Sequence, residues 1–136
     1  YTKIFEPDDI YLLEFMILNK SWWDTVDYIA SKLVGDIFLL YPELRDEHVN
    51  RWLQSENMWL QRSTLLFQLH YKDHTDRALL ASIIYELKES DQFFIKKAIG
   101  WILREYSKTD PEWVRNFAHS TPLKQLSYRE AIKRLS

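Results

Sequence analysis

The sequence predicts an all-α fold, made of tandem antiparallel helix pairs that form a curved α-solenoid. The chain of 136 residues contains only two glycines and four prolines, which is too few for the many turns of an all-β fold. No stretch shows a sustained alternation of apolar and polar residues. Amphipathic segments instead come in pairs that take roughly 35–45 residues each, the length of a HEAT-type repeat. An irregular helical bundle is the competing architecture.

The composition is that of one folded domain, expected to cover residues 1–136, with 46% hydrophobic and 28% charged residues. Without cysteine the chain has no disulfide framework and no thiolate metal site, which fits a reducing cytosol. No apolar run reaches the length of a membrane span. We therefore expect an intracellular, cytoplasmic protein of bacterial type that does not enter membranes.

Charge is distributed unevenly along the chain. Residues 1–90 hold nine Lys/Arg and fifteen Asp/Glu, a net charge of −6, whereas residues 91–136 hold nine and five, a net charge of +4. A basic end of this kind can bind a nucleic acid even though the whole chain is slightly acidic. Random scatter of charge is the alternative explanation.

The first predicted helix opens at Pro7, because proline suits the first turn and the acids Asp8 and Asp9 suit the positive end of the helix dipole. Its apolar stripe consists of Ile10, Leu13, Ile17 and Leu18.

The second predicted helix begins at Ser21, a favourable N-cap, with Asp24 in the place of the usual Glu of a capping box. Gly35 is expected to end it, because glycine is common just after a helix. A short helix over residues 37–40 follows and ends at Pro42.

Two more helices are expected over residues 46–54 and 56–71, the first with Val49, Trp52 and Leu53 turned inward. In the second half, Thr75 is expected to cap a helix over residues 76–88.

Asp91 is expected to cap a long helix that ends near Ser107. The run Asp110-Pro111-Glu112 indicates the start of a further helix, and Ser127 is expected to cap the last one, over residues 128–135.

The first candidate site lies in the run Ser21-Trp-Trp-Asp-Thr-Val-Asp27. Trp23 and Asp27 are four residues apart and share a helix face, whereas Trp22 and Val26 lie on a neighbouring line with Ile29 that looks like core. An outward tryptophan beside a carboxylate indicates a site. Packing of Trp23 between helices is the alternative.

Arg62 is the second candidate, because it interrupts a mostly apolar stretch. A guanidinium there can pair with an acid or with a helix C-terminus, and it can equally hold a phosphate through its planar fork of donors.

The third candidate is a line on one face of the long helix over residues 91–107, where Lys97, Trp101, Arg104 and Lys108 follow at helical spacing. The opposite stripe of Ile95, Ile99, Ile102 and Tyr106 is expected to be buried. Gly100 indicates a close approach by another group. Cations around an aromatic ring suit a nucleic-acid backbone, and a partly buried Trp101 among surface charges is the alternative.

Other chemistry finds little support in the sequence. His70 and His74 are four residues apart, but Lys72 and Asp73 between them indicate a turn rather than a metal site on one helix. The chain has no glycine-rich phosphate loop and no nucleophile elbow.

Three segments carry a resemblance to a known family: SWWDTVD, WLQRSTLL and FFIKKAIGWILREYSKTDPEWVRNF. They resemble the DNA alkylation-repair glycosylases of the AlkD type, which are built from HEAT-like repeats. The likeness runs from about residue 8 to the end, and the family is usually longer at its N-terminus, so upstream helices are expected to be missing from this sequence.

The resemblance implies excision of positively charged N3- and N7-alkylpurines from double-stranded DNA by a monomer, without a metal or cofactor. It places the catalytic set on Trp23, Asp27 and Trp101, and a phosphate contact on Arg62. Lys97 and Arg104 are then expected to bind the DNA backbone. Asp27 would stabilise the positive charge on the sugar and orient a water, while the two indoles would attract the cationic base.

Two other functions are compatible with the sequence. One is a DNA-binding module without catalysis, and the other is a protein-binding scaffold of the same helical-repeat type.

Overall fold

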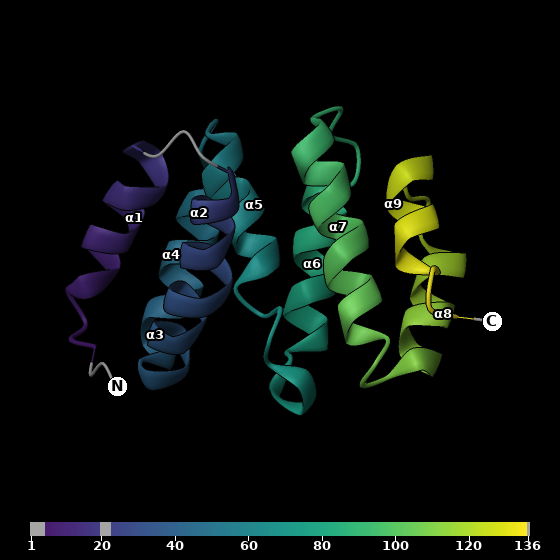
Figure 1. The fold of residues 1–136 in the computed structure, drawn as a ribbon, viewed down its shortest axis with the longest axis horizontal. Coiled ribbons are helices and arrows are strands. Elements are labelled where there is room, and N and C mark those ends of the chain that lie inside the picture. The colour runs from purple at the N-terminus through teal and green to yellow at the C-terminus, as the bar shows by residue number, and fades with distance from the viewer. Residues whose placement is uncertain (1–4, 20–22, 136) are drawn as a thin grey trace. The chain divides into compact units, whose positions relative to one another are not determined.

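The computed structural model describes residues 5–19 and 23–135, with residues 23 and 24 described by their backbone alone. Every regular element in these residues is helical, which confirms the all-α fold. The chain divides into two compact units, Tyr1–His70 and Tyr71–Ser136 (Figure 1). A single domain over residues 1–136 and a continuous curved solenoid remain predictions.

The first unit is built from α-helices around one π-helical segment, η1. Its elements are α1 (Asp9–Asn19), α2 (Trp23–Tyr28), η1 (Ile29–Val34), α3 (Gly35–Leu40), α4 (Pro42–Gln54) and α5 (Met58–Leu66).

Gly35 does not end a helix, contrary to the sequence-based expectation. Its φ of −56° and ψ of −45° are helical, so α2, η1 and α3 follow one another without a break (Figure 1). The helix ends instead at Tyr41, where ψ changes to 76°. The next residue is Pro42, and proline disfavours helical geometry in the residue before it.

The core of the first unit contains most of the expected inward residues. Ile10, Leu13 and Ile17 of α1 are buried, as are Val49 and Trp52 of α4. Two expected core residues are not buried: the Leu18 side chain is 44% exposed, and Leu53 is half-buried.

Aromatic rings fill the centre of this core. The Phe38 ring meets Phe67 edge-on, with 5.2 Å between centroids, and lies 6.0 Å from Trp52. The prediction that Val26 and Ile29 belong to the core is also confirmed, since both are 1% exposed. Ser21 and Trp22 lie outside the described residues.

The second unit begins with a short 3-10 segment and continues with four α-helices in the described residues. Its elements are η2 (Lys72–His74), α6 (Arg77–Leu87), α7 (Phe93–Tyr106), α8 (Pro111–Ser120) and α9 (Gln125–Ala131).

The caps of two of these helices differ from the sequence-based expectation. Asp76, not Thr75, caps α6 by accepting from the Leu79 backbone N–H. Gln92, not Asp91, is the N-cap residue of α7. The expected start of α8 is confirmed, because Asp110 caps it through the Trp113 N–H.

Ser127 does not cap the last helix, because α9 begins two residues earlier, at Gln125. Its buried hydroxyl instead donates to the backbone carbonyl of Lys96 in α7, at 2.9 Å. This hydrogen bond joins the two helices, so the residue serves packing rather than helix initiation.

The buried stripe predicted for α7 is confirmed, since Ile95, Ile99, Ile102 and Tyr106 are all buried. Gly100 packs closely against α9. A Cβ atom there would lie 2.4 Å from Cβ of Glu130. The sequence analysis expected another group to approach Gly100 closely, and this group is the neighbouring helix α9 of the same unit.

Within the part of the chain that the structure describes, no helix has both the length and the apolar character needed to cross a membrane.

Candidate functional site

The first candidate group is a buried ion pair between Asp27 and Arg62. The Arg62 Nε donates to Oδ1 of Asp27 and a terminal guanidinium nitrogen donates to Oδ2, both at 2.9 Å. The carboxylate side chain is 9% exposed and the arginine side chain 5%. Of the partners that the sequence left open for Arg62, the structure places an acid against it.

The local folding of α2 and α5 explains how these two groups meet. Asp27 is the last but one residue of α2, and the hydroxyl of Ser31, one turn later in η1, donates to the Asp27 carbonyl at 2.7 Å. Arg62 lies in α5 between buried leucines, and Asn57 fixes the start of that helix by accepting two backbone N–H groups. π-helical turns are rare in proteins, and those that interrupt an α-helix often lie at functional sites.

Charge pairing in this environment keeps the carboxylate in place. A buried charge is tolerated when it is paired and hydrogen-bonded, and a bidentate guanidinium contact fixes both the position and the plane of the carboxylate. Asp27 is therefore an oriented group rather than a solvated surface residue.

Trp23 begins α2, one helical turn before Asp27. Its side chain lies outside the described part of the structure, so a place beside the carboxylate stays a prediction.

The second candidate group lies on α7 and α9, in the second unit. Trp101 is half-buried on α7. Near it along the same helix, Lys97 Nζ and an Arg104 terminal nitrogen lie 3.5 Å and 3.7 Å from Oε1 of Glu130. Two cations of the predicted line, Lys97 and Arg104, thus lie around a carboxylate from the neighbouring helix, whereas Lys108 pairs with Glu105.

Glu130 was missed by the sequence analysis. Its side chain is 14% exposed, and its carboxylate also accepts from Lys133 Nζ at 3.0 Å. The hydrogen bond from Lys133, with further support from Lys97, lowers the pKa of the Glu130 carboxyl below its ordinary value. The only signal in the sequence was the spacing of Glu130 and Lys133, three residues apart on one helix.

The predicted site residues come from both units of the chain. Trp23, Asp27 and Arg62 belong to the first unit, whereas Lys97, Trp101 and Arg104 belong to the second. A common surface that carries Trp23, Asp27, Arg62 and Trp101 stays a prediction.

Metal chemistry receives no support from the described residues, in which no group of three or more His, Asp or Glu side chains could hold an ion. The expected turn between His70 and His74 is present as η2, where Lys72 has a φ of 52°.

In the part of the chain that the structure describes, the fold is all-helical and holds a buried carboxylate–guanidinium pair and a cationic helix face. Comparisons with known proteins identify the family to which this helical protein belongs. A sequence model described as "DNA alkylation repair enzyme" matches residues 1–135. This chain belongs to the DNA alkylation repair enzyme family.

A solved structure supports the assignment. The chain is similar to one described as "Predicted DNA alkylation repair enzyme from Enterococcus faecalis", with 34% sequence identity and a TM-score of 0.88. The match covers 97% of this chain and 62% of that chain, so the sequence spans less than two thirds of this relative. None of the curated proteins compared with the chain matches it.

Proposed function

We propose that this protein is a monofunctional DNA glycosylase that removes positively charged N3- and N7-alkylated purines from duplex DNA. Family membership along residues 1–135 supports a role in alkylation repair. The observation on which the finer proposal rests is the oriented Asp27 carboxylate, held by Arg62 in a buried setting.

The reaction suits a fixed carboxylate. Water adds to C1′ of the deoxyribose, the bond from C1′ to the purine nitrogen breaks, and its electron pair neutralises the positive charge of the alkylated base. The base leaves without protonation, so the protein has to stabilise the positive charge that develops on the sugar and to accept or relay a proton from water. A carboxylate can serve both needs.

Arg62 acts as a positioning residue in this proposal. A carboxylate has about four lone-pair sites, so two guanidinium N–H groups do not exhaust its capacity to face a sugar or a water. The phosphate contact that the family resemblance implies for Arg62 would need an edge of the guanidinium other than the one that meets Asp27.

The two tryptophans and the surface cations complete the proposed site. Indole faces attract cations by about 0.5–2 kcal/mol each, which favours a charged lesion over a neutral base. Trp23 and Trp101 are proposed for this contact. Lys97 and Arg104 are proposed to bind backbone phosphates without reading sequence.

The test is release of 7-methylguanine from methylated duplex DNA by the purified protein. We expect Asp27→Asn to lower the excision rate by about 100- to 1,000-fold, the effect of losing one well-placed electrostatic group. Asp36→Asn is the matched control, because Asp36 is an exposed acid of α3. Circular dichroism and DNA binding are measured on the same samples.

Trp101 supplies a second test that leaves the buried ion pair intact. We expect Trp101→Ala to lose most excision and Trp101→Phe, which keeps an aromatic face, to retain more of it. Unchanged excision in folded Asp27→Asn and in Trp101→Ala would contradict the proposal. Duplex binding without base release by the unaltered protein would favour a binding module, and absence of both would favour a protein scaffold.

A further inference from the structure

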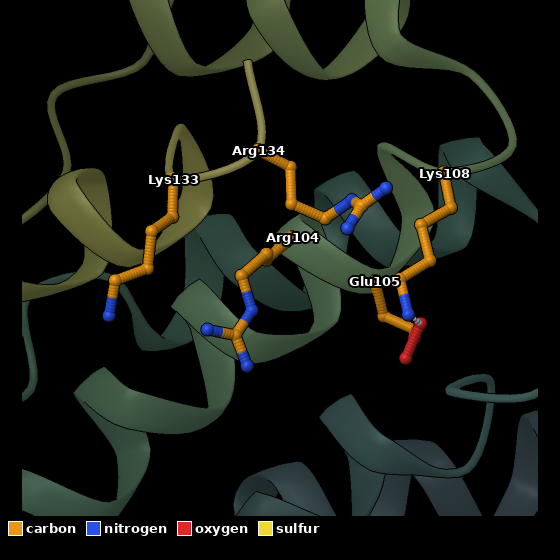
Figure 2. Close-up of a pocket in the computed structure, with 5 residues that line it drawn as sticks. All are labelled: Arg104, Glu105, Lys108, Lys133 and Arg134. Carbon is orange, nitrogen blue, oxygen red and sulfur yellow. Dashed lines mark ion pairs between the residues drawn. The ribbon is translucent and has the colours of Figure 1, made fainter.

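A pocket of about 280 Å³ lies in the second unit, where α7 ends and the chain leaves α9 (Figure 2). Two segments line it. Arg104, Glu105 and Lys108 come from the end of α7 and the turn after it, and Lys133 and Arg134 come from the segment that follows α9 (Figure 2).

Positive charge dominates this pocket, since its lining contains four Lys/Arg and one Glu. Glu105 is engaged by Lys108, whose Nζ lies 2.6 Å from its carboxylate. The side chains of Arg104, Lys108 and Lys133 are 35%, 52% and 60% exposed, so they remain accessible to a ligand from solvent.

Arg134 differs from the other pocket cations in its ion pairing. Within residues 5–19 and 23–135, no carboxylate lies within ion-pair distance of its guanidinium. A planar guanidinium binds a phosphate through two parallel N–H donors, and it lies here beside a second guanidinium, that of Arg104, at the same pocket.

The neighbouring Glu130 arranges this cluster in advance. Its carboxylate lies 3.7 Å from a terminal nitrogen of Arg104 and 3.0 Å from Nζ of Lys133. This one largely buried acid therefore restrains two of the pocket cations. Cations that are already positioned lose less side-chain entropy when an anion arrives. The pocket also continues the α7 line on which Trp101 and Arg104 lie.

We propose that this pocket binds a phosphate of the duplex DNA backbone, with Lys133 and Arg134 as DNA contacts beyond those predicted from the sequence. This inference rests on the proposed function only for the identity of the partner as duplex DNA. It assigns the turn after α9 a role in binding rather than in chemistry.

The test measures how the affinity for undamaged duplex DNA depends on salt. Each lost phosphate contact lowers the slope of log K against log salt by about 1. For the double variant Lys133→Gln/Arg134→Gln we therefore expect a slope that is smaller by about 1 to 2, with a lower affinity at low salt, in fluorescence anisotropy titrations.

The matched control is Arg115→Gln/Arg129→Gln, which removes the same charge from the same unit outside the pocket. Its slope should change less than that of the pocket variant. Equal slopes for the two variants would overturn the proposal, and so would a failure of the unaltered protein to bind duplex DNA. Circular dichroism verifies that both variants fold.

Two further arms separate the possible sources of failure. Inorganic phosphate should displace DNA from the unaltered protein more than chloride does at equal ionic strength, and the pocket variant should lose this difference. Phosphate binding without any change of DNA slope would overturn the assignment to DNA. If the unaltered protein releases the base but the pocket variant keeps the salt slope of the unaltered protein, the pocket proposal alone is refuted. If the pocket variant has a smaller slope but the unaltered protein releases no base, the glycosylase proposal alone is refuted.

Discussion

Each of the two units holds a carboxylate among cations, but the two arrangements differ in burial. In the first unit, Asp27 is met by one arginine through two 2.9 Å hydrogen bonds, and both side chains are less than a tenth exposed. In the second unit, Glu130 is surrounded by Lys97, Arg104 and Lys133, whose side chains are 35–60% exposed.

The comparison shows how burial changes what a charge pair can do. A buried pair has little freedom and fixes the orientation of its carboxylate, but its energy depends on both partners being present. A half-exposed cluster contributes little to stability, because water screens it, and its cations can exchange the internal acid for an external anion. The first arrangement suits chemistry at a fixed point, and the second suits binding.

The largest expected effect comes from breaking the buried pair. Arg62→Met removes the partner of Asp27 and leaves an uncompensated charge, which should lower the free energy of unfolding by about 3–5 kcal/mol. Lys97→Met, the equivalent change in the exposed cluster, should cost about 1 kcal/mol or less. Urea denaturation of both variants measures this difference, and similar losses in the two would show that burial does not distinguish the two charge pairs.

The second prediction concerns the close packing of α7 on α9. Gly100→Ala places a methyl group 2.4 Å from Glu130 Cβ and 3.1 Å from the Ser127 carbonyl oxygen. Overpacking should destabilise the protein by about 1–3 kcal/mol, although alanine is the better helix former.

A double-mutant cycle with Glu130→Gly distinguishes this clash from a general loss of helix stability. The two substitutions together should cost less than the sum of their separate costs, because the second removes the Cβ that the first meets. Strict additivity in thermal unfolding would refute the close contact.

The third prediction separates two neighbouring candidates for the cap of α6. Asp76→Ala should lower stability by about 1 kcal/mol, since the Leu79 N–H loses its acceptor. Thr75→Ala should stay within about 0.5 kcal/mol of the unaltered protein. A larger effect at Thr75 in chemical denaturation would restore the cap expected from the sequence.

The smallest effect concerns pH and compares one carboxylate from each unit. Hydrogen bonding from Arg51 lowers the pKa of Glu14, as hydrogen bonding from Lys133 lowers that of Glu130. A depressed pKa adds stability above the ordinary carboxyl pKa of 4.5, and this stability is lost as the pH falls through the lower, folded-state value.

The variants Glu14→Gln and Glu130→Gln should therefore be less stable than the unaltered protein near neutral pH by up to about 1 kcal/mol each. The gap should close as the pH falls below 4.5. Urea midpoints between neutral and acidic pH measure it. A gap that is independent of pH would show that these carboxyls titrate at their ordinary values.

Most helices of the fold were predictable because helix formation depends on neighbours three and four residues apart. The stripes Ile10–Leu13–Ile17 and Ile95–Ile99–Ile102, and the Asp110 cap of α8, follow from that local pattern. Local preference failed at Gly35, where the helix runs on to Leu40 and ends before Pro42.

The amino-acid sequence by itself determined the helical class, the family and the identity of Asp27, Arg62 and Trp101 as candidates. Only the tertiary structure decided that Arg62 pairs with Asp27, 35 residues away. It also decided that Lys97 and Arg104 of α7 pair with Glu130. The physical reason is that helical periodicity is a local property, whereas the partner of a charge is set by which helices pack together and by how much water remains between them.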